Sequence, residues 1–303
     1  MSNKNFDVLC FGEISCDIIF AGLNTFPVPG REEYCNHFDV KAGGAANTAM
    51  ALSRLGENTL FATCLGEDRF SLICRDYLDK CNVNYGAIHF DPEYKVAVSA
   101  VLSTPCDRGF ATYAGSGING YPLDKLEKMI MQSGHVHTFL GYAGKFPIIE
   151  YAKSFGATIS LDTSWCEGLR IKDIKKQLDA CDIFKPNELE ACEICQTQNP
   201  HDALDMLADF TAMPVISLGE NGVIARKDKI KYEFNLPYEV QAQDTTGAGD
   251  LFAAGLIYSY LKGDEVEDML KFACASGSLA VSFFGGMDDT YTLENINKYL
   301  KQF

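Results

Sequence analysis

The sequence Asp-Thr-Thr-Gly-Ala-Gly-Asp at residues 244–250 is followed at once by an apolar run at residues 251–257. This change predicts a loop that runs directly into a buried helix. The start of a helix carries unpaired N–H groups and a partial positive charge, so it attracts phosphate. Gly247 and Gly249 let a ligand approach the main chain closely. Asp250 would repel phosphate, which costs energy unless the carboxylate has a role such as taking a proton from an attacking hydroxyl. The alternative is that Asp244 or Asp250 only caps the helix.

The composition bounds the fold and the partners. The chain has 303 residues, of which 47% are hydrophobic, which suits one domain with a large core and a small appendage. Its net charge is -15, so its field repels DNA, RNA and anionic membranes. A small anionic ligand is still allowed, because the start of a helix can attract it locally. We therefore expect small-molecule partners, and neither nucleic acid nor membrane.

The twelve cysteines indicate the compartment. They are scattered, and residues 1–5 lead into a strand-like run without a secretory leader. No stretch approaches the roughly 18 consecutive apolar residues that a membrane-spanning helix needs. We expect a cytoplasmic protein whose cysteines are free thiols.

Strand-like and helical segments alternate along most of the chain. Short apolar runs predict strands, and segments with apolar residues on one side predict helices. The alternation is typical of an α/β protein with a central, mainly parallel sheet and helices on both faces. The predicted strands are 8–11, 59–64, 136–140, 158–162, 183–185, 215–218 and 223–226, and the predicted helices are 45–55, 70–80, 147–155, 171–178, 200–210 and 264–283.

Two segments, residues 15–40 and 95–114, interrupt this alternation. They lack helical periodicity and are rich in β-forming residues, as in the run from Val96 to Leu102. We predict that they form a small second β-sheet, which projects from a single domain of residues 1–303. Such a sheet can act as a lid that covers a cleft and excludes water. The alternative is an ordinary extension of the central sheet.

Polar residues follow the first predicted strand. In a parallel α/β sheet, ligands bind outside the carboxyl ends of the strands. Asp17 could there accept hydrogen bonds from two sugar hydroxyls, and a turn aspartate is the alternative. Gly43 and Gly44 precede a helix, where Asn47 adds a donor and an acceptor that suit a polyhydroxy ligand, unless the backbone satisfies its amide.

A second polar group follows the later strands. Asn187 and Glu190 lie three residues apart at a predicted helix start, so their side chains share a face. Glu190 could hold phosphate through Mg²⁺ and water, or the pair could simply cap the helix. Residues 217–222 join two strands, and their Asn-Gly pair is a hairpin signal that by itself says little about a nucleotide.

Two further patterns carry no site in our interpretation. The glycines at residues 115–120 fit the GxGxxG dinucleotide pattern, but Tyr-Pro follows them, so no helix continues from the third glycine. His135 and His137 alternate along a predicted strand, and we expect them to face opposite ways and not to share a metal ion.

Taken together and in this order, the motifs resemble those of the ribokinase-like (PfkB) family of carbohydrate kinases. Gly43, Gly44 and Asn47 are similar to the family's Gly-Gly-x-x-x-Asn pattern, and residues 187–190 to its Asn-x-x-Glu motif. Residues 244–250 match its Asp-Thr-x-Gly-Ala-Gly-Asp signature completely. The resemblance spans almost the whole chain and implies a ribokinase-like fold and an ATP-dependent carbohydrate kinase.

The resemblance also implies catalytic and substrate-binding residues. Asp250 would be the base that activates a primary hydroxyl of a sugar or sugar-like molecule. The anion hole for the transferring phosphoryl group would be formed by Gly247, Ala248 and Gly249. Substrate hydroxyls would be held by Asp17, Gly43 and Asn47.

The cofactor residues follow from the same resemblance. Asn187 and Glu190 would organise Mg²⁺ and phosphate through water, with Glu190 on the side of the metal. Some members bind a monovalent cation such as K⁺ near the Asp-Thr segment, and Asp244 and Thr246 allow such a site here. Many members dimerise through the lid, which allows a homodimer. The ATP site would be lined by Asn187, Ser217, Gly219, Gly222 and Thr246.

The substrate stays open at this level. Ribokinases tend to carry Lys-Gly where this chain has Ala45-Ala46, which argues against ribose, and Cys274 falls where many members carry asparagine near adenine. Arg108, in an expected hairpin turn of the lid, could bind an anionic substrate group, or it could be solvated. We expect a neutral hexose such as fructose. The alternatives are a nucleoside, a sugar acid or sulfonate, or a non-catalytic sugar sensor, which would not need the base Asp250.

Overall fold

An eight-stranded sheet forms the centre of the molecule, with the strand order β14-β13-β12-β11-β10-β9-β1-β4. The computed structural model describes residues 4–104, 108–164, 167–237 and 242–303. Within this sheet, the neighbouring strands from β12 through β11, β10, β9 and β1 to β4 pair in parallel. At the other edge, β13 pairs antiparallel with both β12 and β14. The strands are β1 (Phe6–Phe11), β4 (Thr59–Ala62), β9 (Ser133–Phe139), β10 (Thr158–Asp162), β11 (Ile183–Lys185), β12 (Met213–Ser217), β13 (Val223–Lys227) and β14 (Ile230–Phe234).

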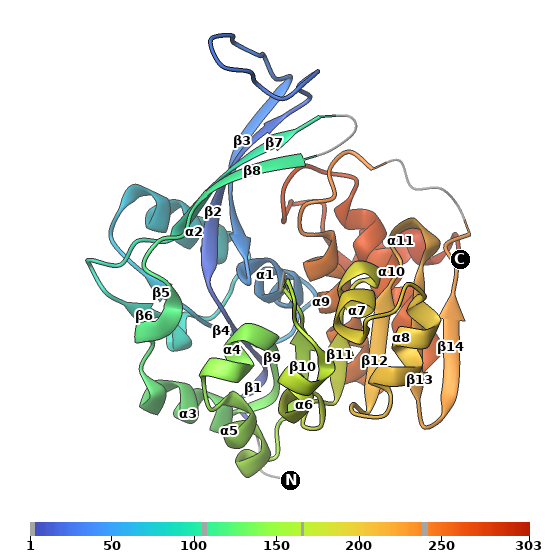
Figure 1. Cartoon of the computed structure of the whole chain (residues 1–303). Helices are drawn as coiled ribbons and strands as arrows, with labels where there is room; N and C mark the ends of the chain where they lie inside the picture. The colour runs from blue at the N-terminus through green and yellow to red at the C-terminus, as the bar shows by residue number, and fades with distance from the viewer. Residues whose placement is uncertain (1–3, 105–107, 165–166, 238–241) are drawn as a thin grey trace.

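Helices cover both faces of this sheet, as predicted (Figure 1). In one group of helices, α9 packs against both α1 and α10, and α10 also packs against α11. The other helix contacts are between α3 and α5, between α4 and α6, and between α7 and α8. The fold is therefore the predicted mainly parallel α/β arrangement. The helices are α1 (Ala46–Arg54), α2 (Arg69–Lys80), α3 (Leu123–Met131), α4 (Leu140–Lys145), α5 (Ile148–Phe155), α6 (Ile171–Leu178), α7 (Glu188–Cys195), α8 (Pro200–Leu207), α9 (Ala248–Lys262), α10 (Val266–Ala280) and α11 (Leu293–Leu300).

Burial on both sides explains the apolar composition of the central elements. In β1, the residues from Val8 to Phe11 are fully buried, because a central parallel strand has helices on each face. Helix α9 is buried from Leu251 to Ile257 and packs against α10. At their contact a side chain on Gly255 would place its Cβ 2.7 Å from that of Ser276, so the helices need glycine here to approach this closely.

A separate four-stranded sheet projects from the main body, and we call it the small sheet (Figure 1). Its order is β3-β2-β7-β8, with β2 and β7 parallel and both outer pairs antiparallel. Strand β2 begins directly after β1, and β3 ends at the start of α1, so the small sheet grows out of the carboxyl edge of the large one. The predicted separate sheet is confirmed. Its strands are β2 (Ile14–Ala21), β3 (His37–Gly44), β7 (Ala97–Ser103) and β8 (Arg108–Tyr113), and a further short pair consists of β5 (Cys64–Leu65) and β6 (His89–Phe90).

The expected orientation of the two histidines on β9 was wrong. Residues two apart on a strand point to the same face. Nε2 of His135 and Nδ1 of His137 each lie 2.8 Å from Oγ of Ser160 on the neighbouring strand. Burial lowers the pKa of both rings to about 3, so both are neutral and contribute to the packing of the sheet.

Among the described residues, no helix is both long and apolar enough to cross a membrane.

Candidate active site

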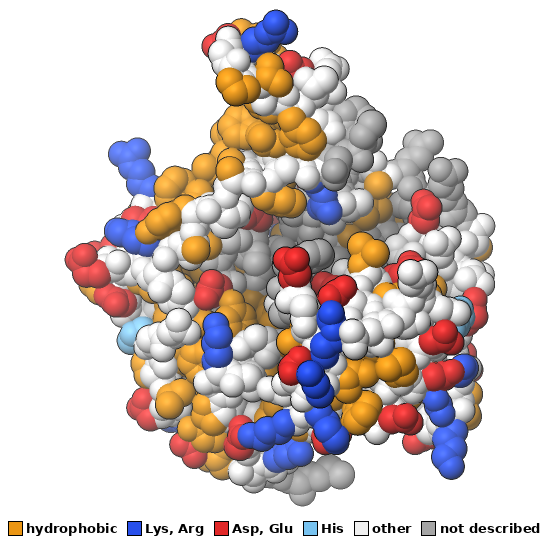
Figure 2. All heavy atoms as spheres, viewed as in Figure 1, with side chains coloured by type: hydrophobic (Ala, Val, Ile, Leu, Met, Phe, Trp, Pro, Cys, Tyr) orange, Lys and Arg blue, Asp and Glu red, His pale blue; other side chains and the backbone are white. Residues whose placement is uncertain are grey.

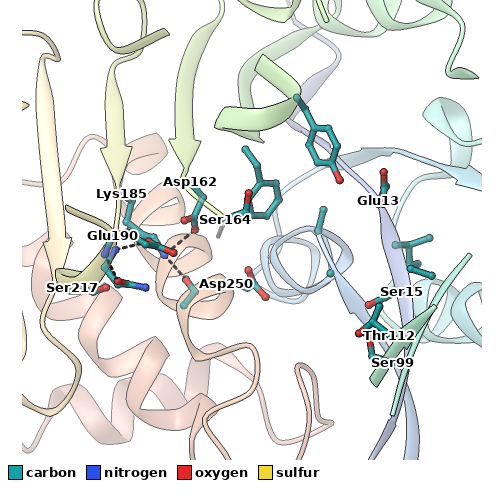
Figure 3. A pocket seen from close by; sticks show the side chains of 18 residues that line it. Glu13, Ser15, Ser99, Thr112, Asp162, Ser164, Lys185, Glu190, Ser217 and Asp250 are labelled. Carbon is teal, nitrogen blue, oxygen red and sulfur yellow. Dashed lines mark hydrogen bonds and ion pairs between the residues drawn. The ribbon is translucent and has the colours of Figure 1, made fainter. Parts of the chain in front are cut away.

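A cavity of about 490 Å³ lies between the carboxyl ends of the central strands and the small sheet (Figure 2). Its polar lining forms two groups, with Asp250 between them (Figure 3). The large sheet and α7 contribute Asp162, Lys185, Glu190 and Ser217, and the β1–β2 connection and the small sheet contribute Glu13, Ser15, Ser99 and Thr112.

Helix α9 begins at this cavity with an uncapped first turn. Gly247 is its N-cap and has a left-handed φ of 75°, and a Cβ there would lie 2.6 Å from Cα of Gly286. A residue with a side chain would be strained and would clash at this position. No side chain of the described residues caps the helix. The capping alternative therefore does not hold, and the first-turn amides are available to an anion.

Asp250 lies in this first turn and lines the cavity. Its Oδ2 accepts a hydrogen bond of 2.9 Å from Nδ2 of Asn47, and its main-chain oxygen accepts one from Thr48. Burial raises the pKa of Asp250 to about 6, and the Asn47 bond opposes this rise. A carboxylate with this pKa is mostly ionised at neutral pH and can accept a proton.

Lys185 connects the large sheet to the start of α9. It is paired with Asp162 in the register of β11 and β10, and its Nζ lies 2.8 Å from Oδ2 of Asp162. The same ammonium donates to the main-chain oxygen of Gly249 at 3.2 Å. Burial disfavours the charged ammonium, but Asp162 and other nearby carboxylates raise the pKa of Lys185. The buried cation thus holds the glycine-rich turn against the sheet.

Asn187 and Glu190 form the predicted reciprocal cap of α7. Oε2 of Glu190 accepts from the amide of Asn187 at 2.8 Å, and Oδ1 of Asn187 accepts from the amide of Glu190 at 2.9 Å. Both side chains also line the cavity. Burial, with a contribution from Asp162, raises the pKa of Glu190. Capping and a place at the cavity are therefore not exclusive alternatives.

Asp17 and Gly43 lie together on the inner face of the small sheet. A Cβ on Gly43 would fall 2.1 Å from Oδ2 of Asp17, so glycine makes room for this carboxylate. Burial raises the pKa of Asp17 to about 6, and a hydrogen bond from Ser15 opposes the rise. Asp17 pairs with Ser99 in the strand register, and Ser99 pairs with Thr112, which places these polar groups in one row.

The remaining predicted residues lie at other positions. Asn47 is buried and donates to Asp250. Nη1 of Arg108 donates to Oγ1 of Thr246 at 3.1 Å, so this arginine contacts the glycine-rich loop. Ser217 lines the cavity, whereas Gly219 and Gly222 lie in the turn beyond it. A Cβ on Gly222 would lie 2.0 Å from the Phe234 oxygen, which gives this glycine a packing role.

Several cavity residues were not predicted. Lys185 and Asp162 end neighbouring parallel strands, where ligands bind, and this position was the signal that could have found them. Glu13 accepts a hydrogen bond from the amide of Ile118 at 3.0 Å. Tyr142 lies on α4, and burial raises its pKa to about 12.

Comparisons with known proteins identify the family of the chain. The family model described as pfkB family carbohydrate kinase matches residues 5–292. The chain therefore belongs to the pfkB family of carbohydrate kinases, and its fold is ribokinase-like.

Two curated relatives and one solved structure illustrate the similarity. Probable fructokinase-7 of Arabidopsis thaliana is 26% identical, over 97% of this chain and 92% of the relative. An ATP-dependent 6-phosphofructokinase of Thermoanaerobacterium thermosaccharolyticum is 23% identical, over 97% of this chain and 94% of the relative. The structure of Arabidopsis thaliana ribokinase complexed with ribose and ATP has a TM-score of 0.82 and 22% identity, over 98% of this chain and 99% of that one.

The first prediction concerns Asp250. Replacing it with asparagine keeps the shape but removes the base, so Asp250→Asn should lower kcat by about 10²-fold or more, with a smaller change in KM. Steady-state kinetics with the preferred sugar measure this. Thermal unfolding at pH 8 is the folding control. The ionised carboxylate with a raised pKa destabilises the folded state above about pH 6, so the variant should be at least as stable as wild type. A variant that keeps most of its kcat would remove Asp250 from this role.

The second prediction concerns pH. A base with a pKa of about 6 is progressively protonated below that pH, so kcat/KM should fall as pH decreases through 6 and level off above it. Asp17 has a similar pKa and should contribute to the same decline. The profile of Asp17→Asn separates the two, because the part due to Asp250 should remain. A flat profile from pH 5 to pH 7 would contradict the assignment.

Proposed function

We propose that this pfkB family carbohydrate kinase transfers the γ-phosphoryl group of ATP to a primary hydroxyl of a neutral sugar, with a hexose such as fructose as the first candidate. The observation that carries the proposal is Asp250, with a pKa of about 6, at the uncapped start of α9 and between the two polar groups of the cavity. One side of Asp250 suits a polyhydroxy substrate, and the other suits a nucleotide.

The reaction that we infer needs little covalent chemistry from the protein. The Asp250 carboxylate takes the proton of the sugar hydroxyl, and the hydroxyl oxygen forms a bond to the γ-phosphorus. The bond from that phosphorus to the bridging oxygen of ADP breaks. The first-turn amides around Gly249, with the helix dipole, stabilise the charge on the transferring group. Asn47 orients the base through its 2.9 Å hydrogen bond.

Mg²⁺ fits the large-sheet side of the cavity. Glu190 and Asp162 supply carboxylate oxygens there. One oxygen of Glu190 and both oxygens of Asp162 already have protein partners, so contact through water suits them better than direct coordination. Among the described residues no group of three or more acidic, histidine or cysteine side chains is arranged to hold a metal ion by itself. Bound with ATP, Mg²⁺ would neutralise phosphate charge, and Glu190 would orient its water.

A neutral substrate follows from the charges of the small-sheet side. Ser15, Ser99 and Thr112 offer hydroxyls there, while Glu13 offers a carboxylate. The one cationic side chain that lines the cavity in the described part of the chain is Lys185, and Asp162 already pairs with it. Among the described residues that line the cavity, a phosphate or carboxylate group on the substrate would therefore meet no unpaired cationic side chain. This favours a sugar like that of the fructokinase relative over a phosphorylated one. A nucleoside remains the second candidate, because the rings of Phe139 and Tyr142 also line the cavity.

We also propose that residues 1–303 form one domain, with the small sheet as its lid. The outer face of that sheet is apolar, and Phe38 and Tyr113 on it are 58% and 60% exposed. Exposed apolar area of this kind is typical of an interface, so we infer a homodimer through the small sheet, which the molar mass in solution tests. The ten described cysteines are free thiols, which supports a cytoplasmic location.

The third prediction concerns the substrate. Burying a phosphate without a cation should cost about 1.5–3 kcal/mol or more, so kcat/KM for fructose should exceed that for fructose 6-phosphate by at least about tenfold. A panel of fructose, ribose, fructose 6-phosphate, a sugar acid and adenosine measures this. Faster turnover of an anionic sugar would refute the neutral-substrate proposal. Tight sugar binding without any turnover would favour a sensor.

The fourth prediction concerns Glu190. Glu190→Gln keeps the shape and removes the charge, so the Mg²⁺ concentration for half-maximal rate should rise by about tenfold or more, the scale of a lost outer-shell partner. Titrating Mg²⁺ at fixed ATP measures it. The matched control is Glu188→Gln on the first turn of the same helix, whose side chain does not line the cavity. An unchanged Mg²⁺ requirement would leave Glu190 with capping alone.

A further inference from the structure

Lys41 of the small sheet binds a loop that packs against the anion hole. It lies on β3, and its side chain is 7% exposed. Its Nζ donates to the main-chain oxygens of Phe284 at 2.7 Å and Met287 at 3.2 Å. The carboxylates of Asp39 and Asp288 lie 3.4 and 3.7 Å from the same nitrogen. Carbonyl and carboxylate oxygens around a single positive charge are also the surroundings that proteins offer to K⁺.

Asp244, the expected ligand of a monovalent cation, is occupied by donors of the protein. Its Oδ1 accepts from the amide and the hydroxyl of Thr246 at 3.0 and 2.7 Å. Its Oδ2 accepts from the amide of Gly285 at 2.8 Å. The Asp244 carboxylate is fully buried, and Nη1 of Arg108 lies 3.9 Å from its Oδ1. A buried carboxylate needs such compensation, and here a guanidinium of the small sheet provides it.

The loop of residues 284–287 connects the surroundings of Lys41 with those of Asp244. Residues 284–287, which Lys41 holds at both ends, contain Gly285, which binds Asp244. They also contain Gly286, whose Cα leaves no room for a side chain on Gly247. The left-handed turn at Gly247 therefore rests on a loop that Lys41 fixes, and Thr246 beside it rests on Arg108. The residues at both centres do not fit a bound monovalent cation, because groups of the protein already occupy their oxygens. Lys41 does so at the first centre, and the donors of Thr246 and Gly285, with Arg108 nearby, do so at the second.

We propose that Lys41 and Arg108 are positioning residues that take the place of a bound monovalent cation and order the anion hole from the small sheet. For its catalytic consequence this inference rests on the proposed kinase function. The kinase should consequently need no K⁺. It also links the small sheet to the anion hole, because both cations belong to strands of that sheet. A small sheet displaced from the main body would remove both positive charges from the glycine-rich loop.

The test compares potassium chloride with tetramethylammonium chloride at equal ionic strength, since the second cation is too large for a carbonyl site. For wild type, kcat should differ by less than twofold and Tm by less than about 1 °C between the salts, because no cation site contributes. For Lys41→Met we expect a kcat at least about tenfold lower in tetramethylammonium, with KM for ATP changed less, which is the pattern of a lost transition-state contact. Potassium should restore part of the lost kcat and of the lost Tm. Lys80→Met, which alters an exposed lysine lining the same small cavity beside Asp288, is the matched control and should behave as wild type.

Two results would overturn the inference. The first is a wild-type protein that K⁺ activates tenfold or stabilises by several degrees. The second is a Lys41→Met variant that keeps its kcat and Tm in tetramethylammonium. If Lys41→Met does not fold, the wild-type comparison still decides, and Lys41→Arg, which keeps the charge, should remain independent of K⁺. A protein without turnover on any sugar would end the proposed function instead, and the wild-type Tm comparison would still test the cation sites.

Discussion

The proposed kinase function sets one electrostatic constraint on the site, which is that an acid and a phosphate would share the start of the same helix. The amides and dipole of α9 attract phosphate, while Asp250 in its first turn repels it. Three features of the structure accompany this opposition between the helix start and Asp250. Asn47 donates to the carboxylate, Lys185 brings a buried positive charge to Gly249, and Gly247 turns the chain so that no capping side chain is needed. Burial still raises the pKa of Asp250 to about 6, which suits the base that the proposed reaction needs near neutral pH.

The connectivity of the chain brings the two sides of the cavity together. Strand β1 ends at the carboxyl edge of the large sheet and passes through Gly12 and Glu13 into β2 of the small sheet, and β3 returns into α1. Asp17 and Gly43 are therefore placed by strands that start and end beside the site, while Asn47 follows in the first turn of α1. The strands of the small sheet thus carry Asp17 and Gly43 and lead directly into the helix that holds Asn47, the donor to Asp250. If the small sheet acts as the proposed lid, it is built from the same strands as the proposed substrate site.

Much of this fold could be predicted from the sequence, because several elements are marked by signals that lie within a short segment of the chain. The buried runs of β1 and α9 and the turn glycines at 247 and 222 mark their positions with little help from the rest of the chain. The short helices α3 and α11 were missed, although their apolar residues recur at helical spacing and bury Leu126 and Ile130 in α3 and Ile296 in α11. The edge strand β14 was missed because its residues are largely exposed.

The candidate site could be predicted in part, for a related reason. Motif residues that act through their own backbone, such as 247–249, are visible in sequence. Pairs that meet through strand order are not. Asp162 and Lys185 meet because β10 and β11 are neighbours in parallel register, and Arg108 reaches Thr246 from a different sheet. The opposite-face expectation for His135 and His137 failed for a simpler reason, since a two-residue spacing on a strand preserves the face.

Charge also explains how the cavity can select against substrates that resemble the preferred one. Selectivity is a difference between two binding free energies, and repulsion of the wrong ligand contributes to it as much as attraction of the right one. On the small-sheet side, Glu13 lines the cavity and Asp17 lies on the inner face of the sheet. Lys185 on the large-sheet side is paired with Asp162, and Arg108 contacts the glycine-rich loop. A hydroxyl can donate to these carboxylates, whereas a phosphate or carboxylate in the same place adds like charge in a partly desolvated site. The Arg108 contact with Thr246 therefore has two consequences. It ties Arg108 to the glycine-rich loop, which would receive the phosphoryl group in the proposed reaction. It also engages the side chain that would best suit an anionic substrate.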